Sequence, residues 1–154
     1  MKIELRLATE QDIPALDSLA EAIDACQFMS RHLPDRLQKI QWEVIVVDGV
    51  DVGTVWAEAN PRLPNVAFLG IFIGRSDLLG KGVGRHVIQQ IVTKLHDVSP
   101  DLAIRLNVRS NNTRAIACYA RCGFIQIMTG KKIGIDGAPI PATTMQFSPS
   151  SACH

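Results

Sequence analysis

The chain has 154 residues, 47% hydrophobic and 20% charged, which is the balance of one globular domain with a sizeable core. Its formal net charge is +1 and its basic residues are scattered, which argues against nucleic acid as a partner. No apolar stretch approaches the roughly 18 residues that cross a bilayer, and the alternating N-terminal residues are unlike a secretory signal. We therefore expect one cytoplasmic domain over residues 1–147, a flexible tail at 148–154, and no membrane partner.

The predicted elements begin with a strand and a helix. Residues 2–8 alternate apolar and polar side chains, as a half-buried strand does. Thr9 and Asp12 then form a near capping box, and apolar side chains recur at helical spacing up to Ile23. The less regular segment 26–40 is predicted to contain a second short helix. Residues 43–47 and 52–58 are predicted to be antiparallel strands around a turn at 48–51.

The second half of the chain alternates strands and helices more clearly. Two prolines predict a loop at 60–65, and the almost wholly apolar run 66–73 is typical of a central strand buried on both faces. A glycine-rich loop leads into a predicted helix at 83–96, followed by a strand at 103–108. A further helix at 112–122 should end at Gly123. Residues 124–135 and 140–147 flank Asp136 and Gly137, which predicts a hairpin.

The resulting order is β-α-α-β-β-β-α-β-α-β-β, which predicts a mixed sheet with helices on its faces. The cysteines are Cys26, Cys118, Cys122 and Cys153. Cys118 and Cys122 lie one helical turn apart, but no second pair of ligands accompanies them. The pattern therefore favours reduced thiols over a zinc site.

A candidate phosphate-binding loop is the first chemical motif. Residues 79–85, Leu-Gly-Lys-Gly-Val-Gly-Arg, follow an apolar strand and open a helix. Alternate glycines allow a tight turn that points N–H groups at one spot, where the helix N-terminus adds partial positive charge. The P-loop pattern is absent, and the third glycine comes one residue too early for a dinucleotide fingerprint. On this motif alone, a glycine-rich turn without a ligand stays open.

A second motif follows downstream, in residues 106–124. Together the two motifs resemble the GCN5-related N-acetyltransferase (GNAT) superfamily, with its loop Arg/Gln-x-x-Gly-x-Gly/Ala and its helix Asn-x-x-Ala-x-x-x-Tyr followed by Gly-Phe. The matching residues are Gly82, Gly84, Asn112, Ala115, Tyr119, Gly123 and Phe124. The resemblance covers residues 3–147. The run 73–84 is similar to the aminoglycoside 6'-type branch, where an aliphatic residue also stands at the position of Leu79.

The resemblance implies a mixed, mostly antiparallel sheet of about seven strands with helices on both faces. The fourth and fifth strands would splay apart to admit acetyl-coenzyme A, a co-substrate that needs no metal. Its diphosphate would rest on the amides of residues 79–85, and its pantetheine arm would run along the fourth strand. The residues that the resemblance places at the cofactor are Phe72, Ile73, Gly74, Leu79, Gly80, Lys81, Gly82, Val83, Gly84, Arg85, Asn107, Asn112, Ala115 and Tyr119.

The implied reaction is direct attack of a neutral amine on the thioester carbon, with amides of the fourth strand stabilising the oxyanion. Tyr119 is the expected general acid, unless it is only a core aromatic. The base is less defined, because Asn107 and Gly70 stand where some relatives carry a carboxylate. Glu58 is the best remaining carboxylate, unless it is only a solvated strand-end charge, and Asp77 is a weaker candidate.

The acceptor amine is expected to contact Phe28, His32 and Trp56, each of which has a core or surface interpretation as well. The predicted function is acetylation of a primary amine on a small molecule. Acetylation of a protein N-terminus or lysine, and non-catalytic sensing of acyl-coenzyme A, are the alternatives. The segment 26–42 and the hairpin at Asp136 should decide between an enclosed pocket and an open groove. Analogy with family dimers suggests that exposed final strands form a homodimer.

Overall fold

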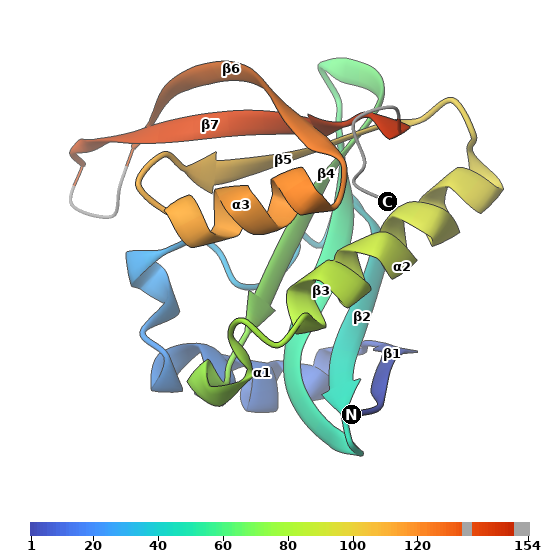
Figure 1. Ribbon diagram of the computed structural model, residues 1–154, viewed down its shortest axis with the longest axis vertical. Helices are drawn as coiled ribbons and strands as arrows, with labels where there is room; N and C mark the ends of the chain where they lie inside the picture. The colour runs from blue at the N-terminus through green and yellow to red at the C-terminus, as the bar shows by residue number, and fades with distance from the viewer. Residues whose placement is uncertain (134–136, 150–154) are drawn as a thin grey trace.

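A computed structural model describes residues 1–133 and 137–149, which form one sheet and three α-helices (Figure 1). The strands are β1 (Ile3–Leu7), β2 (Lys39–Val47), β3 (Val50–Asn60), β4 (Leu63–Ile73), β5 (Ala103–Arg109), β6 (Phe124–Ile133) and β7 (Pro139–Phe147). The helices are α1 (Ile13–Ala22), α2 (Val83–Val98) and α3 (Thr113–Arg121). Within the described residues, no helix combines the length and apolar character that crossing a bilayer requires.

The sheet has seven strands in the order β1-β2-β3-β4-β5-β7-β6. Every neighbouring pair is antiparallel except β4 and β5, which run parallel. The predicted mixed, mostly antiparallel sheet is therefore confirmed. The edge strand β6 leaves the apolar side chains of Ile125, Ile127 and Met128 exposed.

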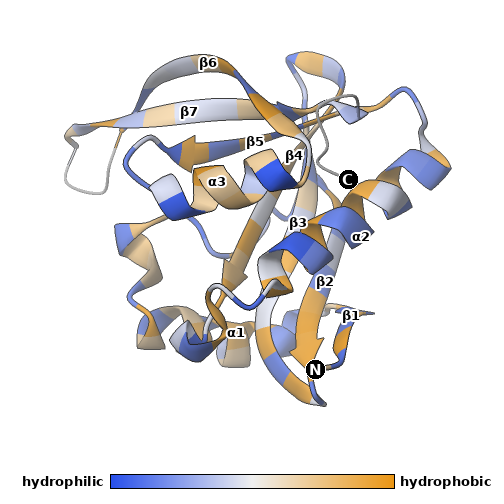
Figure 2. Cartoon of the chain, in the orientation of Figure 1, coloured by the Kyte–Doolittle hydropathy of each residue, from blue (hydrophilic) through white to orange (hydrophobic). Residues whose placement is uncertain are grey.

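Two apolar cores cover opposite faces of the sheet, because successive strand residues point to opposite sides. On one face, α2 buries the side chains of Val87, Ile88 and Ile91 against β3, β4 and β5, and α3 packs beside it. On the other face, Leu16 and Ala20 of α1 pack on Trp42, Trp56 and Phe72. Figure 2 shows β3 and β4 as mainly apolar ribbons, whereas α2 and α3 alternate between apolar and polar residues. The expected helices on both faces are confirmed.

Two local predictions were wrong. No second helix forms in segment 26–40, where only the 3-10 turn Ala25–Gln27 is helical. Pro34 interrupts the segment, and Asp35 instead holds a turn by accepting the Leu37 amide at 2.9 Å on its side chain and the Lys39 amide at 3.0 Å on its carbonyl.

The predicted loop at 60–65 is also shorter than expected. It shrinks to a turn at residues 61–62, and β4 already begins at Leu63. A register shift between Ala59 and Asn60 closes this hairpin, and Pro64 is tolerated because it stands at the start of its strand. The predicted hairpin of 124–135 and 140–147 is present as β6 and β7, but its tip at Asp136 and the tail from residue 150 lie outside the described residues.

The parallel strands β4 and β5 separate partway along their length. Their pairing runs from Val66 with Ala103 to Leu69 with Leu106 and ends there. Strand β4 continues to Ile73, whereas β5 continues to Arg109 paired only with β7. The predicted splay is confirmed, and the gap explains why residues 70, 71 and 73 are only partly buried, although the sequence predicted a strand buried on both faces.

Candidate functional site

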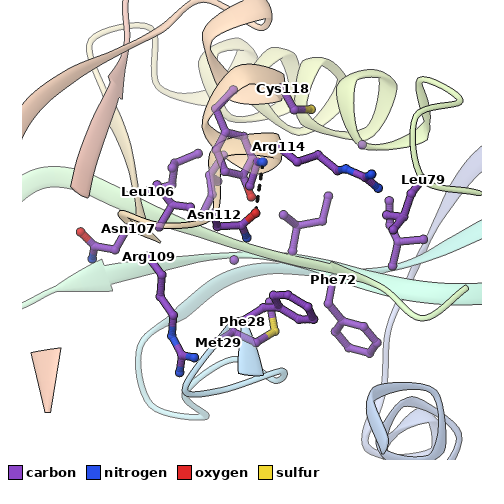
Figure 3. A pocket seen from close by; sticks show the side chains of 18 of the residues that line it. Phe28, Met29, Phe72, Leu79, Leu106, Asn107, Arg109, Asn112, Arg114 and Cys118 are labelled. Carbon is purple, nitrogen blue, oxygen red and sulfur yellow. Dashed lines mark hydrogen bonds between the residues drawn. The ribbon is translucent and has the colours of Figure 1, made fainter. Parts of the chain in front are cut away.

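A single cleft of about 1280 Å³ opens at the gap between β4 and β5. Its walls come from residues 68–73 of β4, the glycine loop with the start of α2, helix α3, and the segment 27–31. Figure 3 shows Leu79 at one side of this cleft, Asn107 and Arg109 at the other, and Phe28 and Met29 between them below β4. Elements far apart in sequence therefore share one elongated site.

The glycine loop presents free backbone donors to the cleft. Gly80 and Gly82 have φ values of +76° and +84°, left-handed conformations that favour glycine. The amides of Gly80 and of residues 82–85 donate to no acceptor among the described residues. The amides of Leu79 and Lys81 donate instead to the carbonyls of Ser76 and Leu78, at 3.2 and 3.3 Å. Five of the seven predicted donors are therefore available to an anion at the N-terminus of α2.

The unpaired part of β4 offers a second set of backbone groups. The amide of Gly74 donates to Val52 on β3 at 2.6 Å. Because N–H groups alternate sides along a strand, those of Ile71 and Ile73 face the gap that β5 leaves. An extended chain such as a pantetheine arm could bond there in the manner of an added strand.

Helix α3 brings the second motif to the opposite wall. The side chain of Asn112 caps the helix by accepting the amide of Ala115 at 3.3 Å (Figure 3). Tyr119 lines the same wall and is partly buried, and burial raises the pKa of its phenol. Its hydroxyl has no hydrogen-bond partner among the described residues, so no protein group there competes for its proton. Asn107 also lines the cleft, but its side-chain oxygen accepts the hydroxyl of Thr144 at 2.6 Å.

The far end of the cleft holds the predicted carboxylate. Glu58 is 8% exposed and lines the cleft, but both of its oxygens are bonded by the guanidinium of Arg31, at 2.8 and 3.0 Å. The amide of Asp35 also donates to it at 3.2 Å. Glu58 is thus an ion-paired carboxylate, and Phe28 and Trp56 lie in the same part of the lining.

Gly70 is closed off by a neighbouring aromatic ring. It pairs directly with Trp56 on β3, and a Cβ added at Gly70 would lie 2.1 Å from Cζ2 of the indole. Since the indole fills that space, no carboxylate side chain fits at residue 70 without displacing Trp56.

Four predicted residues lie outside the cleft. His32 contacts Asp17 at 2.7 Å and the ring of Phe72, and it lines a separate small pocket beside α1. Gly74 packs against α1, and Lys81 does not line the cleft. Asp77 is an exposed carboxylate whose pKa is lowered by its hydrogen bonds from Arg75. The remaining predicted residues all contribute to the lining.

Among the cleft residues that the motifs did not indicate, Arg31, Arg109, Cys118 and Lys132 carry charged or reactive groups. Arg109 lies two residues after Asn107 in β5, so both side chains are on the same face of the strand. This spacing could have identified Arg109 as a cleft residue from the sequence. Cys118 lies one residue before Tyr119, and the neighbouring Cys122 thiol, Arg121 and Arg85 lower its pKa to about 7. Nothing in the sequence pointed to Arg31 or Lys132.

Comparison with known proteins decides the family. The model of the acetyltransferase (GNAT) family matches residues 14–124. The chain belongs to this family. A search of curated proteins found no match.

Solved structures with the GNAT fold resemble the whole chain. Aminoglycoside acetyltransferase AAC(6')-Ib in complex with coenzyme A has a TM-score of 0.76 at 21% identity, covering 97% of this chain and 96% of that one. The ribosomal alpha-N-protein acetyltransferase RimL in complex with coenzyme A has a TM-score of 0.78 at 17% identity, covering 95% and 93%. A ribosomal-protein-alanine N-acetyltransferase from Brucella melitensis has a TM-score of 0.71 at 22% identity, covering 93% and 98%. At these identities the likeness establishes the shared GNAT fold.

The cleft of this GNAT chain fits acetyl-coenzyme A, the co-substrate of its family. The free amides at the start of α2 match a diphosphate, and the unpaired edge of β4 matches the amide-bearing pantetheine arm. Arg85 and Arg121 lie near Cys118, and together with Arg114 they line the cleft and supply positive charge for phosphate groups. The chain is an acyl-coenzyme A-dependent N-acetyltransferase by family and by the architecture of this cleft.

Proposed function

We propose that this enzyme acetylates the primary amine of a small molecule. The observation that carries the proposal is the shape of the acceptor end of the cleft. Residues 28–31 contribute to its lining, and so do Lys132, Ile140 and Ala142 of the β6–β7 hairpin, with Lys132 near Arg31 and Glu58. We expect this convergence of two chain segments to suit a small amine better than the extended groove that a polypeptide acceptor would need.

Acetyl-coenzyme A would supply an activated thioester carbonyl at the gap in the sheet. The N–H groups of Ile71 and Ile73 face this gap and could donate to the carbonyl oxygen as negative charge develops on it. Because they belong to a fixed strand, these donors need little reorganisation during the reaction.

Tyr119 is the proposed general acid for the leaving thiolate. Its raised pKa keeps the phenol protonated at neutral pH, and its hydroxyl has no partner among the described residues that would compete for the proton. Glu58 is the proposed acceptor for the proton of the attacking amine, directly or through water. Arg31 holds this carboxylate in place through both of its oxygens, and Oε2, which accepts only the Arg31 hydrogen bond among the described residues, keeps a lone pair for the proton of the amine.

The Tyr119→Phe variant tests this assignment. We expect a loss of about 100-fold or more in kcat, the usual contribution of a positioned acid, with unchanged coenzyme A affinity and unfolding midpoint. The assay follows thiol release from acetyl-coenzyme A with a library of amines, and calorimetry measures cofactor binding. Unchanged kcat would remove Tyr119 from the mechanism. Tight cofactor binding by the wild-type protein without thiol release from any amine would favour a sensor instead.

A further inference from the structure

Basic side chains outnumber acidic ones in the lining of the cleft, although the net charge of the chain is only +1. Six basic side chains and two acidic ones line the whole cleft. Arg85, Arg114 and Arg121 belong to α2 and α3, where the phosphates of the co-substrate are expected. The other three cations, Arg31, Arg109 and Lys132, lie toward the acceptor end.

Two of these three cations have no carboxylate partner in the part of the chain that the structure describes. Arg31 is neutralised by its two hydrogen bonds with Glu58. Arg109 donates only to the carbonyl of Gln27, a neutral group, and forms no ion pair within the described residues. Lys132 likewise forms no ion pair there. The other acidic residue of the lining, Asp24, bonds instead to Gln27 and Cys26.

The cations are close enough to affect one another. Loss of hydration within the cleft and the charges of Arg31 and Arg109 lower the pKa of Lys132, while Glu58 opposes this shift. Like charges brought together without counterions cost free energy, which a bound anion would recover. Figure 3 shows Arg109 extending from the end of β5 in the direction of Phe28 and Met29, and its guanidinium donates to the carbonyl of Gln27, the residue before Phe28.

We propose that the acceptor is an α-amino acid or a close analogue, whose carboxylate binds between Arg109 and Lys132 while its amine lies near Glu58. This inference rests on the proposed function and narrows its substrate class. Such a zwitterion carries its two charges a few bonds apart, which matches a site where cations lie beside a carboxylate. Phe28, Met29 and Trp56 then offer an apolar surface for the side chain. A polycationic acceptor would meet two unpaired positive charges and be repelled.

The test compares α-amino acids with their carboxamides, which keep the amine and the side chain but lack the negative charge. Calorimetry or NMR titration measures the binding of each pair to the enzyme saturated with coenzyme A, so the readout does not require turnover. We expect at least one acid to bind 10-fold or more tightly than its carboxamide. In Lys132→Gln and Arg109→Gln this preference should fall to 3-fold or less, with unchanged affinity for coenzyme A.

Lys131→Gln is the matched control, because Lys131 is the neighbouring exposed lysine of β6 and does not line the cleft. It should leave the preference intact. Equal binding of acids and carboxamides, or selective binding of peptides whose N-terminal residue has no free carboxylate, would overturn the inference. Thiol release, measured in parallel, reports on the proposed function separately. A preference for acids without thiol release would support the ligand class while refuting catalysis.

Discussion

The contact between Gly70 and Trp56 yields a prediction whose size follows from the geometry. In Gly70→Ala the new methyl group would lie 2.1 Å from Cζ2 and 2.2 Å from Cε2 of the indole, whereas ordinary contacts begin near 3.4 Å. The ring or the strand must therefore move by more than 1 Å. Trp56 is 4% exposed and packs against Leu16, Trp42 and Phe72, so it has little room to move.

Overpacking of this kind typically costs about 1–3 kcal/mol, and we expect a value near the upper limit because the two residues are paired across adjacent strands. For a domain of this size, about 3 kcal/mol corresponds to a fall of roughly 6–12 °C in Tm. Urea unfolding of the wild type and the variant measures the cost. Gly130→Ala is the control, because a Cβ at Gly130 meets nothing within 4 Å and should change stability by less than about 0.5 kcal/mol.

A double-mutant cycle isolates the contact itself. Trp56→Phe removes most of the indole atoms near Gly70, so Gly70→Ala should cost at least about 1 kcal/mol less in that background. Equal costs in the two backgrounds, or a cost below about 0.5 kcal/mol in the wild type, would refute the conclusion that the indole closes the space beside residue 70.

Three further predictions concern the cofactor end and the core. Gly84→Leu should reduce coenzyme A affinity 10-fold or more by calorimetry, because a Cβ at residue 84 points between Sγ of Cys118 at 3.7 Å and Cδ1 of Ile73 at 3.8 Å, which both line the cleft, so a longer side chain enters the site. Gly84→Ala, which the family motif allows, should bind nearly as well as the glycine, and unchanged affinity in Gly84→Leu would contradict the site. Alkylation of Cys118 by iodoacetamide should reach half its maximal rate near pH 7, and that of Cys26 only at a higher pH, because the pKa of Cys118 is lowered to about 7 whereas the hydrogen bond with Asp24 raises the pKa of Cys26. Coenzyme A should slow only the reaction of Cys118, and mass spectrometry that finds Cys26 reacting at the lower pH would reject this ordering. Lys94→Met should destabilise the fold by about 2 kcal/mol, because it leaves the buried Glu43 carboxylate without the ammonium partner that is now 2.5 Å away; the cost is lower than for a fully buried pair because Lys94 is half exposed. Adding Glu43→Gln should recover part of this loss in urea unfolding, and a double variant no more stable than Lys94→Met alone would count against the explanation.

The sequence predicted those parts of the site that depend on local backbone chemistry. The glycines at 80 and 82 indicate left-handed turns, and Asn112 indicates a helix cap, because each residue type has few alternatives at such positions. The splay between β4 and β5 came from the family resemblance, since hydrophobic periodicity alone indicates a strand but not where its pairing ends.

Long-range pairs escaped prediction. The Arg31–Glu58 ion pair joins residues 27 apart, and the bond from Arg109 to the Gln27 carbonyl joins residues 82 apart. The apolar residues of segment 26–40 follow neither helical nor strand spacing, so the sequence does not predict where this segment lies. The positions of Arg31 and of the Gln27 carbonyl at the acceptor end could therefore not be predicted. His32, a plausible acceptor contact from its position in the chain, instead packs beside α1.

NMR tests most directly whether the free amides at the start of α2 bind the diphosphate of coenzyme A. Coenzyme A added to ¹⁵N-labelled enzyme should shift the amide resonances of Gly80, Gly82 and Gly84 strongly, while Gly49 and Gly130, which do not line the cleft, stay unchanged. Pantetheine, which lacks the diphosphate, should leave the three loop resonances largely in place while shifting those of Ile71 and Ile73. Saturating coenzyme A that binds by calorimetry yet leaves the loop resonances unmoved would contradict the account.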